Sequence, residues 1–342
     1  MCSLIGGIEG GATHSHAVIL SAAGELVSVA QGPTTNYHLI GMTECRKRIA
    51  DLITEAKRNA GIAPDVPLEA LGLGLSGCEL EESNVELQKG LERNYPLLSR
   101  RYAIGSDTEG SLAAVSNRGG VTCIAGTGSN TLLINPDGGK FQCRGWGHML
   151  GDEGSAWHIS WRAIKYCFDD LDRFEDAPHP IDAVWNLVRD HFRIKTQRDI
   201  LDSFYKNFDK AFVASLCKRL ADVARGGDPL AAAVFREAGR HLAKSVASVA
   251  ARAAPELTSR EGGLHVLCVG SVWLSWDLLR DGFVDCLRSE GRPPAGPLSL
   301  LRLTTEMGIG SALMAADRLG LRLDRDYTKN FHVFYVYNDE AN

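Results

Sequence analysis

The sequence predicts an α/β protein of two related halves with a cleft between them. Its 342 residues correspond to about two domains of roughly 100–200 residues each. Apolar runs typical of strands alternate with stretches typical of helices in both halves. One strand–turn–strand pattern also recurs, because Thr13 precedes a turn glycine, Gly24, by 11 residues and Thr127 precedes Gly138 by the same 11. The recurrence indicates a duplicated unit, with chance likeness between two ordinary hairpins as the alternative.

The individual elements follow from apolar periodicity and from turn residues. In the first half, the expected strands are residues 4–8, 17–20, 26–29, 71–75 and 102–104. A loop is expected over residues 32–41, and helices are expected from Thr43 to Gly61, over 79–94 and from about Ser111. In the second half, the expected strands are residues 121–125, 132–134 and 264–269, with a hairpin turn at 135–139. Residues 155–251 are mostly helical in this interpretation, 308–319 form a helix and 292–297 form a loop.

Composition and charge exclude several classes of protein. The chain is 44% hydrophobic and 23% charged, which is ordinary for a globular protein, and its net charge of -5 offers no basic surface for nucleic acid or an anionic membrane. Apolar runs such as Leu230–Phe235 are far shorter than the roughly 18 residues of a membrane helix. The first basic residue is Arg46, so neither a signal peptide nor a mitochondrial transit peptide is expected. We therefore expect a cytoplasmic protein.

Nine scattered cysteines without a C-x-x-C pair predict reduced, mostly buried thiols rather than a disulfide framework or a zinc ribbon. Cys143 is the cysteine nearest to a glycine-rich segment that we consider part of the active site, so it is a candidate for regulation.

Two glycine-rich loops, residues 9–13 (EGGAT) and 126–130 (GTGSN), each follow an expected strand. Glycines let backbone N–H groups approach phosphate oxygens, and a threonine hydroxyl adds a donor. Either loop alone is more often a simple turn, but two loops facing each other predict a clamp for a nucleotide polyphosphate. The chain has neither a Walker A motif nor the HRD and DFG motifs of protein kinases.

The run 72–77 (GLGLSG) matches the dinucleotide-binding pattern G-x-G-x-x-G. That site needs a strand before the first glycine, whereas here alternating leucines place the glycines within the strand itself. We therefore interpret the run as a core strand that ends in a Ser-Gly turn.

Three further features offer side chains for a ligand. Asp107 follows a short strand and is either a helix N-cap or a general base. Residues 145–155 (GWGHMLGDEGS) combine small residues with polar groups suited to a sugar, although structural hydrogen bonding is the favoured interpretation of His148 and Glu153. The strand 266–269 ends in Gly-Ser, where α/β sheets bind ligands, and is a candidate for the adenosine site.

Taken in order, the motifs resemble the N-acetyl-D-glucosamine kinases of animals, within the sugar kinase, heat-shock ATPase and actin superfamily. The segments that carry the likeness are 6–13, 35–36, 106–107, 126–130, 145–155 and 268–273, and G-W-G-H-M-x-G-D-E-G-S-A is the most specific of them. The resemblance covers about residue 5 to at least residue 320. It implies two ribonuclease-H-like domains of the actin and hexokinase type that close over their substrates, and a homodimer.

The resemblance also implies roles for individual residues. The ATP site would comprise Gly11, Thr13, Thr127, Gly270, Ser271 and Ser275. The sugar site would comprise Asn36, Asp107, Ser129, Asn130, Gly145, Trp146, Gly147 and Asp152. Asp107 would be the catalytic base, and Glu9, which stands where the superfamily usually has aspartate, would hold Mg²⁺ through water. His14 stands where a basic residue is common.

We therefore expect an ATP- and Mg²⁺-dependent kinase that converts N-acetylglucosamine to its 6-phosphate. Residues 1–117 would form the smaller domain, with sugar and phosphate contacts. Residues 118–342 would form the larger, nucleotide-binding and dimer-forming domain, whose C-terminal segment is a candidate for packing back on the first. The alternatives are an ATPase that activates a partner enzyme, a sugar-binding regulator, and a kinase that also accepts N-acetylmannosamine or muramyl sugars.

Overall fold

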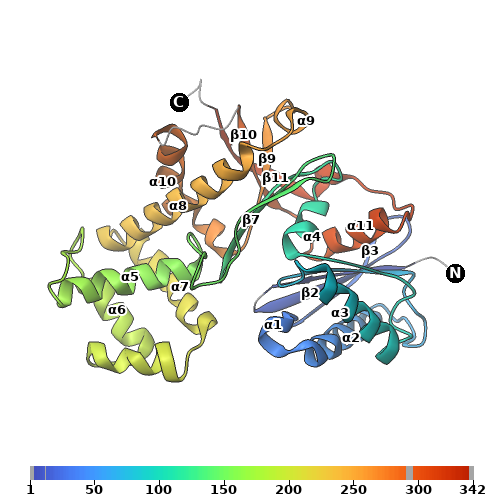
Figure 1. Ribbon diagram of the computed structural model, residues 1–342, viewed down its shortest axis with the longest axis horizontal. Coiled ribbons are helices and arrows are strands. Elements are labelled where there is room, and N and C mark those ends of the chain that lie inside the picture. The colour runs from blue at the N-terminus through green and yellow to red at the C-terminus, as the bar shows by residue number, and fades with distance from the viewer. Residues whose placement is uncertain (1–3, 12, 290–295, 339–342) are drawn as a thin grey trace.

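The computed structural model describes residues 4–11, 13–289 and 296–338. It contains two β-sheets, each in its own lobe, and helices α4 (Asp107–Ala113) and α11 (Ile309–Arg318) lie between the sheets (Figure 1). Several strands end at the junction between the lobes, and this is where the predicted ligand-binding loops lie.

The first sheet has five strands in the order β3-β2-β1-β4-β5. Strand β2 is antiparallel to both of its neighbours, whereas β1, β4 and β5 are parallel to one another. The strands are β1 (Ile5–Gly10), β2 (His14–Leu20), β3 (Leu26–Pro33), β4 (Ala70–Leu75) and β5 (Tyr102–Gly105).

The second sheet repeats this order and these directions. Its strands β8-β7-β6-β9-β10 correspond one by one to β3-β2-β1-β4-β5, and β11 is added antiparallel to β10. The strands are β6 (Gly120–Ala125), β7 (Ser129–Ile134), β8 (Lys140–Arg144), β9 (Leu264–Val269), β10 (Leu298–Leu303) and β11 (Phe331–Tyr337). The predicted duplicated α/β fold is confirmed, and the turns that contain Gly24 and Gly138 occupy equivalent hairpins.

Helices of the first lobe match the expected pattern with two corrections. They are α1 (Tyr37–Ile40), α2 (Met42–Asn59), α3 (Glu81–Asn94) and α4. The expected loop 32–41 contains the short helix α1, which Asn36 caps by accepting from the His38 N–H at 2.9 Å. Helix α4 begins at Asp107 rather than near Ser111, because Ser106 supplies the N-cap.

The second lobe is mostly helical over residues 155–251, as expected. Its helices are α5 (Ala156–Leu171), α6 (Asp182–Phe192), α7 (Lys210–Arg225), α8 (Pro229–Ala250), α9 (Pro255–Thr258) and α10 (Trp276–Ser289), with shorter turns at Gln197–Ile200, Asp202–Lys206, Ser271–Ser275 and Tyr327–Lys329. Sequence reasoning named no strand at β8, β10 or β11, although the β11 sequence FHVFYVY is rich in residues that favour strands. The expected loop 292–297 lies largely outside the described residues.

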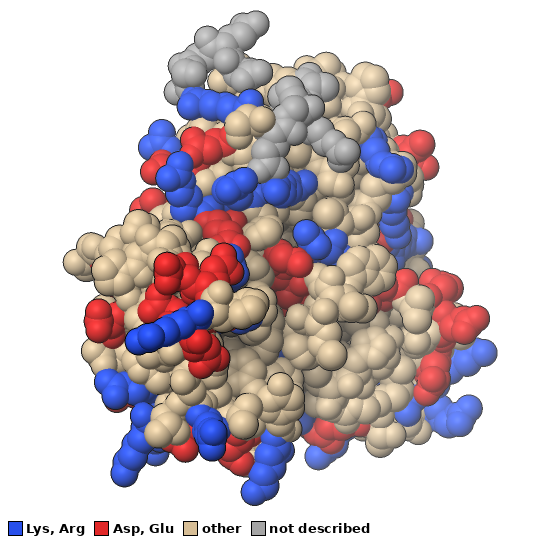
Figure 2. Space-filling model, turned by 60° about the vertical axis from the view of Figure 1, so that its left-hand side comes forward, with Lys and Arg blue, Asp and Glu red and all other residues tan. Residues whose placement is uncertain are grey.

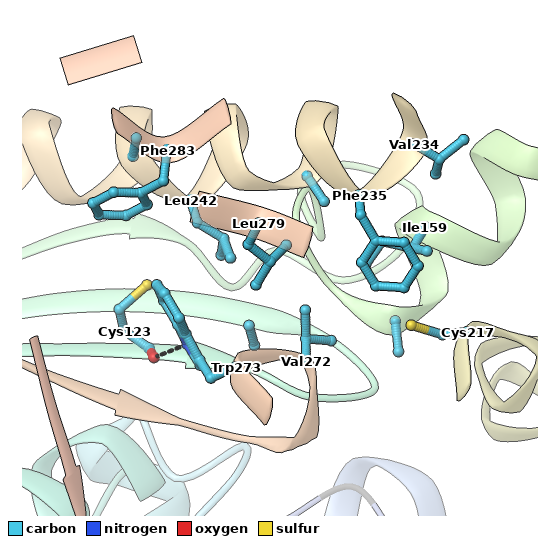
Figure 3. Packing of buried hydrophobic residues seen from close by; sticks show 14 of the residues in the cluster. Cys123, Ile159, Cys217, Val234, Phe235, Leu242, Val272, Trp273, Leu279 and Phe283 are labelled. Atoms are coloured by element: carbon cyan, nitrogen blue, oxygen red, sulfur yellow. Dashed lines mark hydrogen bonds between the residues drawn. The ribbon is translucent and has the colours of Figure 1, made fainter. Parts of the chain in front are cut away.

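The second lobe is held together by an apolar core between its sheet and helices α5, α7, α8 and α10. Figure 3 shows the large side chains of this core, with Phe283 and Leu242 above Trp273. The Trp273 indole N–H donates to the Cys123 carbonyl at 2.9 Å, so its polar atom is satisfied inside the core. Trp273 lies in the short turn Ser271–Ser275 that follows β9.

The surface and the thiols are unremarkable for a globular protein. On the face drawn in Figure 2, acidic and basic side chains are interspersed. No helix among the described residues combines the length and the apolar character needed to cross a membrane. The eight described cysteines are free, and Cys143 on β8 is the one that is not fully buried.

Helix α11 returns from the end of the chain to the first lobe, where it covers β1 and β4. Small residues permit this approach: a Cβ on Gly7 would lie 2.1 Å from the Gly308 carbonyl oxygen, and one on Gly72 would lie 1.8 Å from the Ser311 carbonyl oxygen. Gly72 is therefore a packing glycine inside β4, which confirms that the G-x-G-x-x-G run is a core strand. The domain division at residue 117 stays a prediction.

We expect Gly72→Ala to destabilise the protein by roughly 1–3 kcal/mol or more, because its methyl group would push α11 off the first sheet. The loss should appear as a lower midpoint in chemical denaturation. Gly126→Ala is the matched control, since a Cβ there meets nothing within 4 Å. Equal stability of the two variants would show that α11 does not need this close contact.

Candidate functional site

The two glycine-rich loops meet between the lobes. Each connects the first two strands of its own sheet, β1 to β2 in one case and β6 to β7 in the other. The hydroxyl oxygens of Thr13 and Thr127 lie 3.2 Å apart, although the residues are 114 positions apart in the chain. The two hydroxyls therefore face one small volume, as a clamp on a shared group requires.

The first loop is shaped by contacts with the segment after β3. A Cβ on Gly10 would lie 2.2 Å from the Thr35 hydroxyl, so only glycine fits there. The Thr34 hydroxyl donates to the Gly11 carbonyl at 2.8 Å and accepts from the Asn36 N–H at 3.1 Å. Asn36 is thereby tied to the loop that carries Thr13, while its own side-chain oxygen caps α1.

The second loop is supported from below by the start of α5 and from one side by β9. The Gly126 N–H donates to the Gly128 carbonyl at 2.9 Å, and the Ala156 N–H donates to the Gly126 carbonyl at 2.8 Å. Gly270 has φ of +104°, and a Cβ on it would lie 2.4 Å from the Ala125 carbonyl oxygen. Exposed Ser271 follows directly, so it lies at the edge of this loop.

Ser275 is placed differently from the other residues of the expected ATP site. It is buried, and its hydroxyl accepts from an Arg225 guanidinium N–H at 3.3 Å. Arg225 is also paired with Asp277 at 2.8 Å. The Ser275 hydroxyl is thus engaged in an ion-pair network one turn beyond Ser271.

Asp107 is the first residue of α4 and is 8% exposed. The N-cap is Ser106, which forms a reciprocal capping box with Glu109. The interpretation of Asp107 as the cap is therefore wrong, because the preceding residue already satisfies the helix N-terminus. One Asp107 oxygen accepts from the Thr108 N–H at 2.8 Å, and Ser76 hydrogen-bonds to the carboxyl group.

Glu9 and Asp107 form a buried pair of carboxyl groups at the ends of β1 and β5. Burial and the neighbouring Asp107 raise the pKa of Glu9 to about 8. Burial, with a contribution from Glu79, raises the pKa of Asp107 to about 6, against the opposing hydrogen bond from Ser76. Two crowded carboxylates are a donor set that suits Mg²⁺, which prefers oxygen ligands and would relieve their repulsion.

Asp152 is buried beside the second loop. One of its oxygens accepts from the Ser129 N–H at 3.0 Å, and the other lies 2.6 Å from the Lys210 ammonium. A Cβ on Gly128 would lie 2.8 Å from the Asp152 carboxylate and 3.2 Å from the Lys210 ammonium. The acidic and basic side chains therefore both border the loop that carries Thr127.

The segment after β8 places the remaining expected sugar contacts. Gly145 has φ of +84°, and a Cβ on it would lie 2.7 Å from the Asn130 side chain, so glycine brings this segment onto β7. Trp146 is 65% exposed, so its ring is available to a ligand. His148 packs between Trp157 and Phe208, which is a structural role.

Sequence reasoning missed two polar residues of this region. Lys210 begins α7, more than 50 residues after Asp152, and no local pattern connects the two. Ser76 stands at the carboxyl end of β4, where open α/β sheets bind ligands, so that position was a usable signal. Glu153, for which structural hydrogen bonding was favoured, pairs with Arg144 at 3.0 Å.

Comparison of the sequence with protein-family models assigns the chain to a family. The model of the BadF/BadG/BcrA/BcrD ATPase family matches residues 7–289, which is most of the chain. The chain belongs to the BadF/BadG/BcrA/BcrD ATPase family. The matched range includes both glycine-rich loops, Asp107 and the Asp152 segment.

Two proteins of known name resemble this chain at modest identity. It is 26% identical over 246 residues to the N-acetylmuramic acid/N-acetylglucosamine kinase of Clostridium acetobutylicum, covering 71% of this chain and 78% of that protein. It is 24% identical over 258 residues to the N-acetyl-D-glucosamine kinase of Dictyostelium discoideum, with the same coverage. The resemblance stated from sequence is confirmed.

Solved structures confirm the sugar-kinase type of fold. A Chromobacterium violaceum protein assigned as an N-acetylglucosamine kinase superposes with a TM-score of 0.71 at 22% identity, covering 92% of this chain and 99% of that one. A ROK family glucokinase from Streptomyces griseus, solved with glucose and AMPPNP, gives 0.54 at 16% identity, covering 92% and 99%.

We expect Glu9→Gln to stabilise the protein increasingly as pH rises. The pKa of Glu9 in the folded chain, about 8, is above its ordinary value of 4.5. The folded state therefore holds a proton that the unfolded chain releases, and the stability from this proton is complete below 4.5 and lost as pH rises through 8. Glutamine stays neutral, so the Tm of the variant minus that of wild type should grow from about pH 5 to about pH 9 in magnesium-free buffer.

Glu86→Gln, on the exposed face of α3, is the matched control and should show no such trend. If the Tm difference between Glu9→Gln and wild type stays constant with pH, the pKa of Glu9 is not raised in the folded protein.

Proposed function

We propose that this ATPase-family protein is a kinase that transfers the γ-phosphoryl group of ATP to the 6-hydroxyl of N-acetyl-D-glucosamine. The observation that carries the proposal is the contact between Thr13 and Thr127, next to the buried pair Glu9 and Asp107. It supports a phosphate clamp and a candidate base at one junction between the lobes. The names of the curated relatives support the choice of sugar.

In this proposal the two loops hold the polyphosphate. Thr13 and Thr127 donate from opposite lobes, and Gly11 holds the first loop in a tight turn, since its N–H donates to the His14 carbonyl at 2.9 Å. Gly270 and Ser271 border the second loop on the side proposed for adenosine. Because the donors come from both lobes, ATP would draw the lobes together and exclude water that otherwise competes as a nucleophile.

Asp107 is the proposed general base. A pKa raised to about 6 keeps its carboxylate mostly ionised at neutral pH while making it a stronger base than an ordinary aspartate. It would accept the proton of the sugar hydroxyl as that oxygen attacks the phosphoryl group. Glu9 would hold Mg²⁺ through water, and the ion would supply positive charge to the transferring phosphoryl group.

The sugar would lie between Asp107 and Asp152. Asn36, Ser129, Asn130 and Asp152 offer donors and acceptors for its hydroxyl and acetamido groups. Gly145 and Gly147 leave room for the ring, and exposed Trp146 offers an apolar face. Lys210 pairs with Asp152, so the sugar would share this carboxylate with the lysine or displace it.

A broader sugar range is the second candidate function. The Clostridium relative is named for N-acetylmuramic acid as well as N-acetylglucosamine. The family name also keeps an ATPase acting without a sugar acceptor as an alternative. The homodimer implied by the resemblance stays a prediction.

We expect Asp107→Asn to lower kcat by roughly 10²–10⁴, because an amide cannot accept the hydroxyl proton. The variant should stay folded, since Ser106 caps α4, and should keep part of its sugar affinity through the amide oxygen. The wild type should lose kcat/KM as pH falls below about 6, where Asp107 becomes protonated.

Tm, sugar Kd and kcat should be measured on one preparation, with Asp51→Asn on the exposed face of α2 as the control. If the folded Asp107→Asn protein binds sugar and keeps more than about a tenth of its kcat, Asp107 is not the base.

We expect N-acetylglucosamine to exceed glucose by at least roughly tenfold in kcat/KM, equivalent to about 1.4 kcal/mol, because glucose leaves the acetamido-binding groups unpaired. ADP release with each sugar, including N-acetylmannosamine and N-acetylmuramic acid, measures this range. Equal turnover of glucose would indicate a general hexokinase, and undiminished ADP release without any sugar would indicate an ATPase.

A further inference from the structure

A second cluster of ligand-type side chains lies on two helices of the second lobe, apart from the glycine-rich loops. His158 belongs to the first turn of α5, and Glu237 and His241 lie one turn apart on α8. One ligand atom from each residue lies within 4.8 Å of those from the other two. The centroids of the two imidazole rings are 4.9 Å apart, and the rings meet edge to face. Two helices thus bring three potential metal ligands together.

The two histidines carry buried nitrogen atoms that the described part of the chain leaves unsatisfied. The Nδ1 atoms of His158 and His241 have no hydrogen-bond partner there, and His158 is only 8% exposed. Buried polar atoms without a partner are rare in native proteins and cost free energy. Two such histidines in one cluster with a carboxylate indicate that a bound species belongs at the cluster.

The protonation state of the cluster suits a metal ion rather than an anion. Burial, with a contribution from His241, lowers the pKa of His158 to about 4. His158 is therefore neutral at pH 7 and has a lone pair to offer, as metal ligation requires. Burial opposes ionisation of Glu237, but interactions with His241, Arg162 and Tyr166 outweigh it and lower the pKa of Glu237 to about 2, so this carboxylate is ionised.

Glu237 is also held in a fixed orientation. The Arg162 guanidinium donates to its two oxygens at 3.0 and 3.1 Å, and the Tyr166 hydroxyl donates at 3.1 Å. Such outer hydrogen bonds orient the ligands of metal sites. The positive charge of Arg162 repels a metal cation, so the affinity for the metal should be lower than it would be without this arginine. The negative charge of Glu153 has the opposite effect and favours a cation near His158.

We propose that His158, Glu237 and His241 bind a divalent transition-metal ion, for which Zn²⁺ is the expected occupant. Imidazole nitrogen with one carboxylate is a ligand set typical of Zn²⁺, whereas Mg²⁺ prefers oxygen alone. Three protein ligands leave a position for water, and the side chains of Glu237 and His241 are 28% and 24% exposed, so the ion has access from solvent.

The position of the cluster suggests what the ion would do. Gly154, just before α5, packs so closely on α8 that a Cβ there would lie 2.8 Å from Leu242. The ion would join the first turn of α5 to α8 at this contact. It would therefore brace the helix that follows the Asp152 segment, which is a structural role separate from the proposed transfer reaction.

The test is metal binding by the full-length protein after removal of metal with a chelator. Wild type should bind one equivalent of Zn²⁺ in the presence of excess Mg²⁺, with a higher Tm when loaded. Co²⁺ should give visible absorption bands of a low-symmetry site with nitrogen ligands. His158→Gln and His241→Gln should each weaken Zn²⁺ binding at least about 100-fold, since loss of even an outer hydrogen-bond partner costs 10–100-fold.

His179→Gln is the matched control, because His179 is an exposed histidine on the same lobe, and it should bind Zn²⁺ as wild type does. Absence of Zn²⁺ binding and of the Co²⁺ spectrum in wild type would overturn the proposal whatever the variants do. Binding that survives unchanged in folded His158→Gln and His241→Gln proteins would overturn it as well.

Discussion

The burial of two carboxyl groups at the junction of the lobes is the constraint on which the rest of the site depends. Glu9 lies near the end of β1 and Asp107 begins α4 after β5, and each has a raised pKa because burial disfavours its charged form. Ionised neighbours are costly in such a place unless a cation or a hydrogen bond compensates. The fold keeps both groups, which is typical of a site that handles protons or metal-bound phosphate.

Glycines make the crowding around these carboxyl groups possible. Gly7 and Gly72 allow α11 to cover the first sheet, and Gly10 allows the Thr35 segment to touch the first loop. Gly270 does the same between β9 and the end of β6. At each of these glycines, a neighbouring backbone atom or hydroxyl group occupies the space that a Cβ would need. The duplicated sheets can therefore bring their strand ends, and the loops at those ends, into contact.

Charge is divided between the two lobes. The first lobe contributes the acidic pair, whereas the second contributes Lys210 beside the Gly128 loop, balanced by Asp152. A lysine there places one positive charge beside Gly128, the residue that follows Thr127. Phosphoryl transfer depends on positioning and electrostatics, so the placement of these charged groups bears directly on the proposed reaction.

The sequence alone was sufficient for the class of fold, the duplicated hairpins and the two glycine-rich loops, because strand alternation, turn glycines and loop composition are local patterns. It also placed Asp107 at the end of a strand, but it left open whether that residue is a cap or a base. The structure excludes the cap, because Ser106 fills that position, and it shows the burial and the neighbours Glu9 and Ser76 that the sequence does not; the role of Asp107 as base stays a proposal. Lys210, the packing role of Gly72 and the pairing of His158 with His241 likewise depend on segments far apart in the chain. No local pattern records such contacts, because which distant side chains meet is determined by how the helices pack on the two sheets.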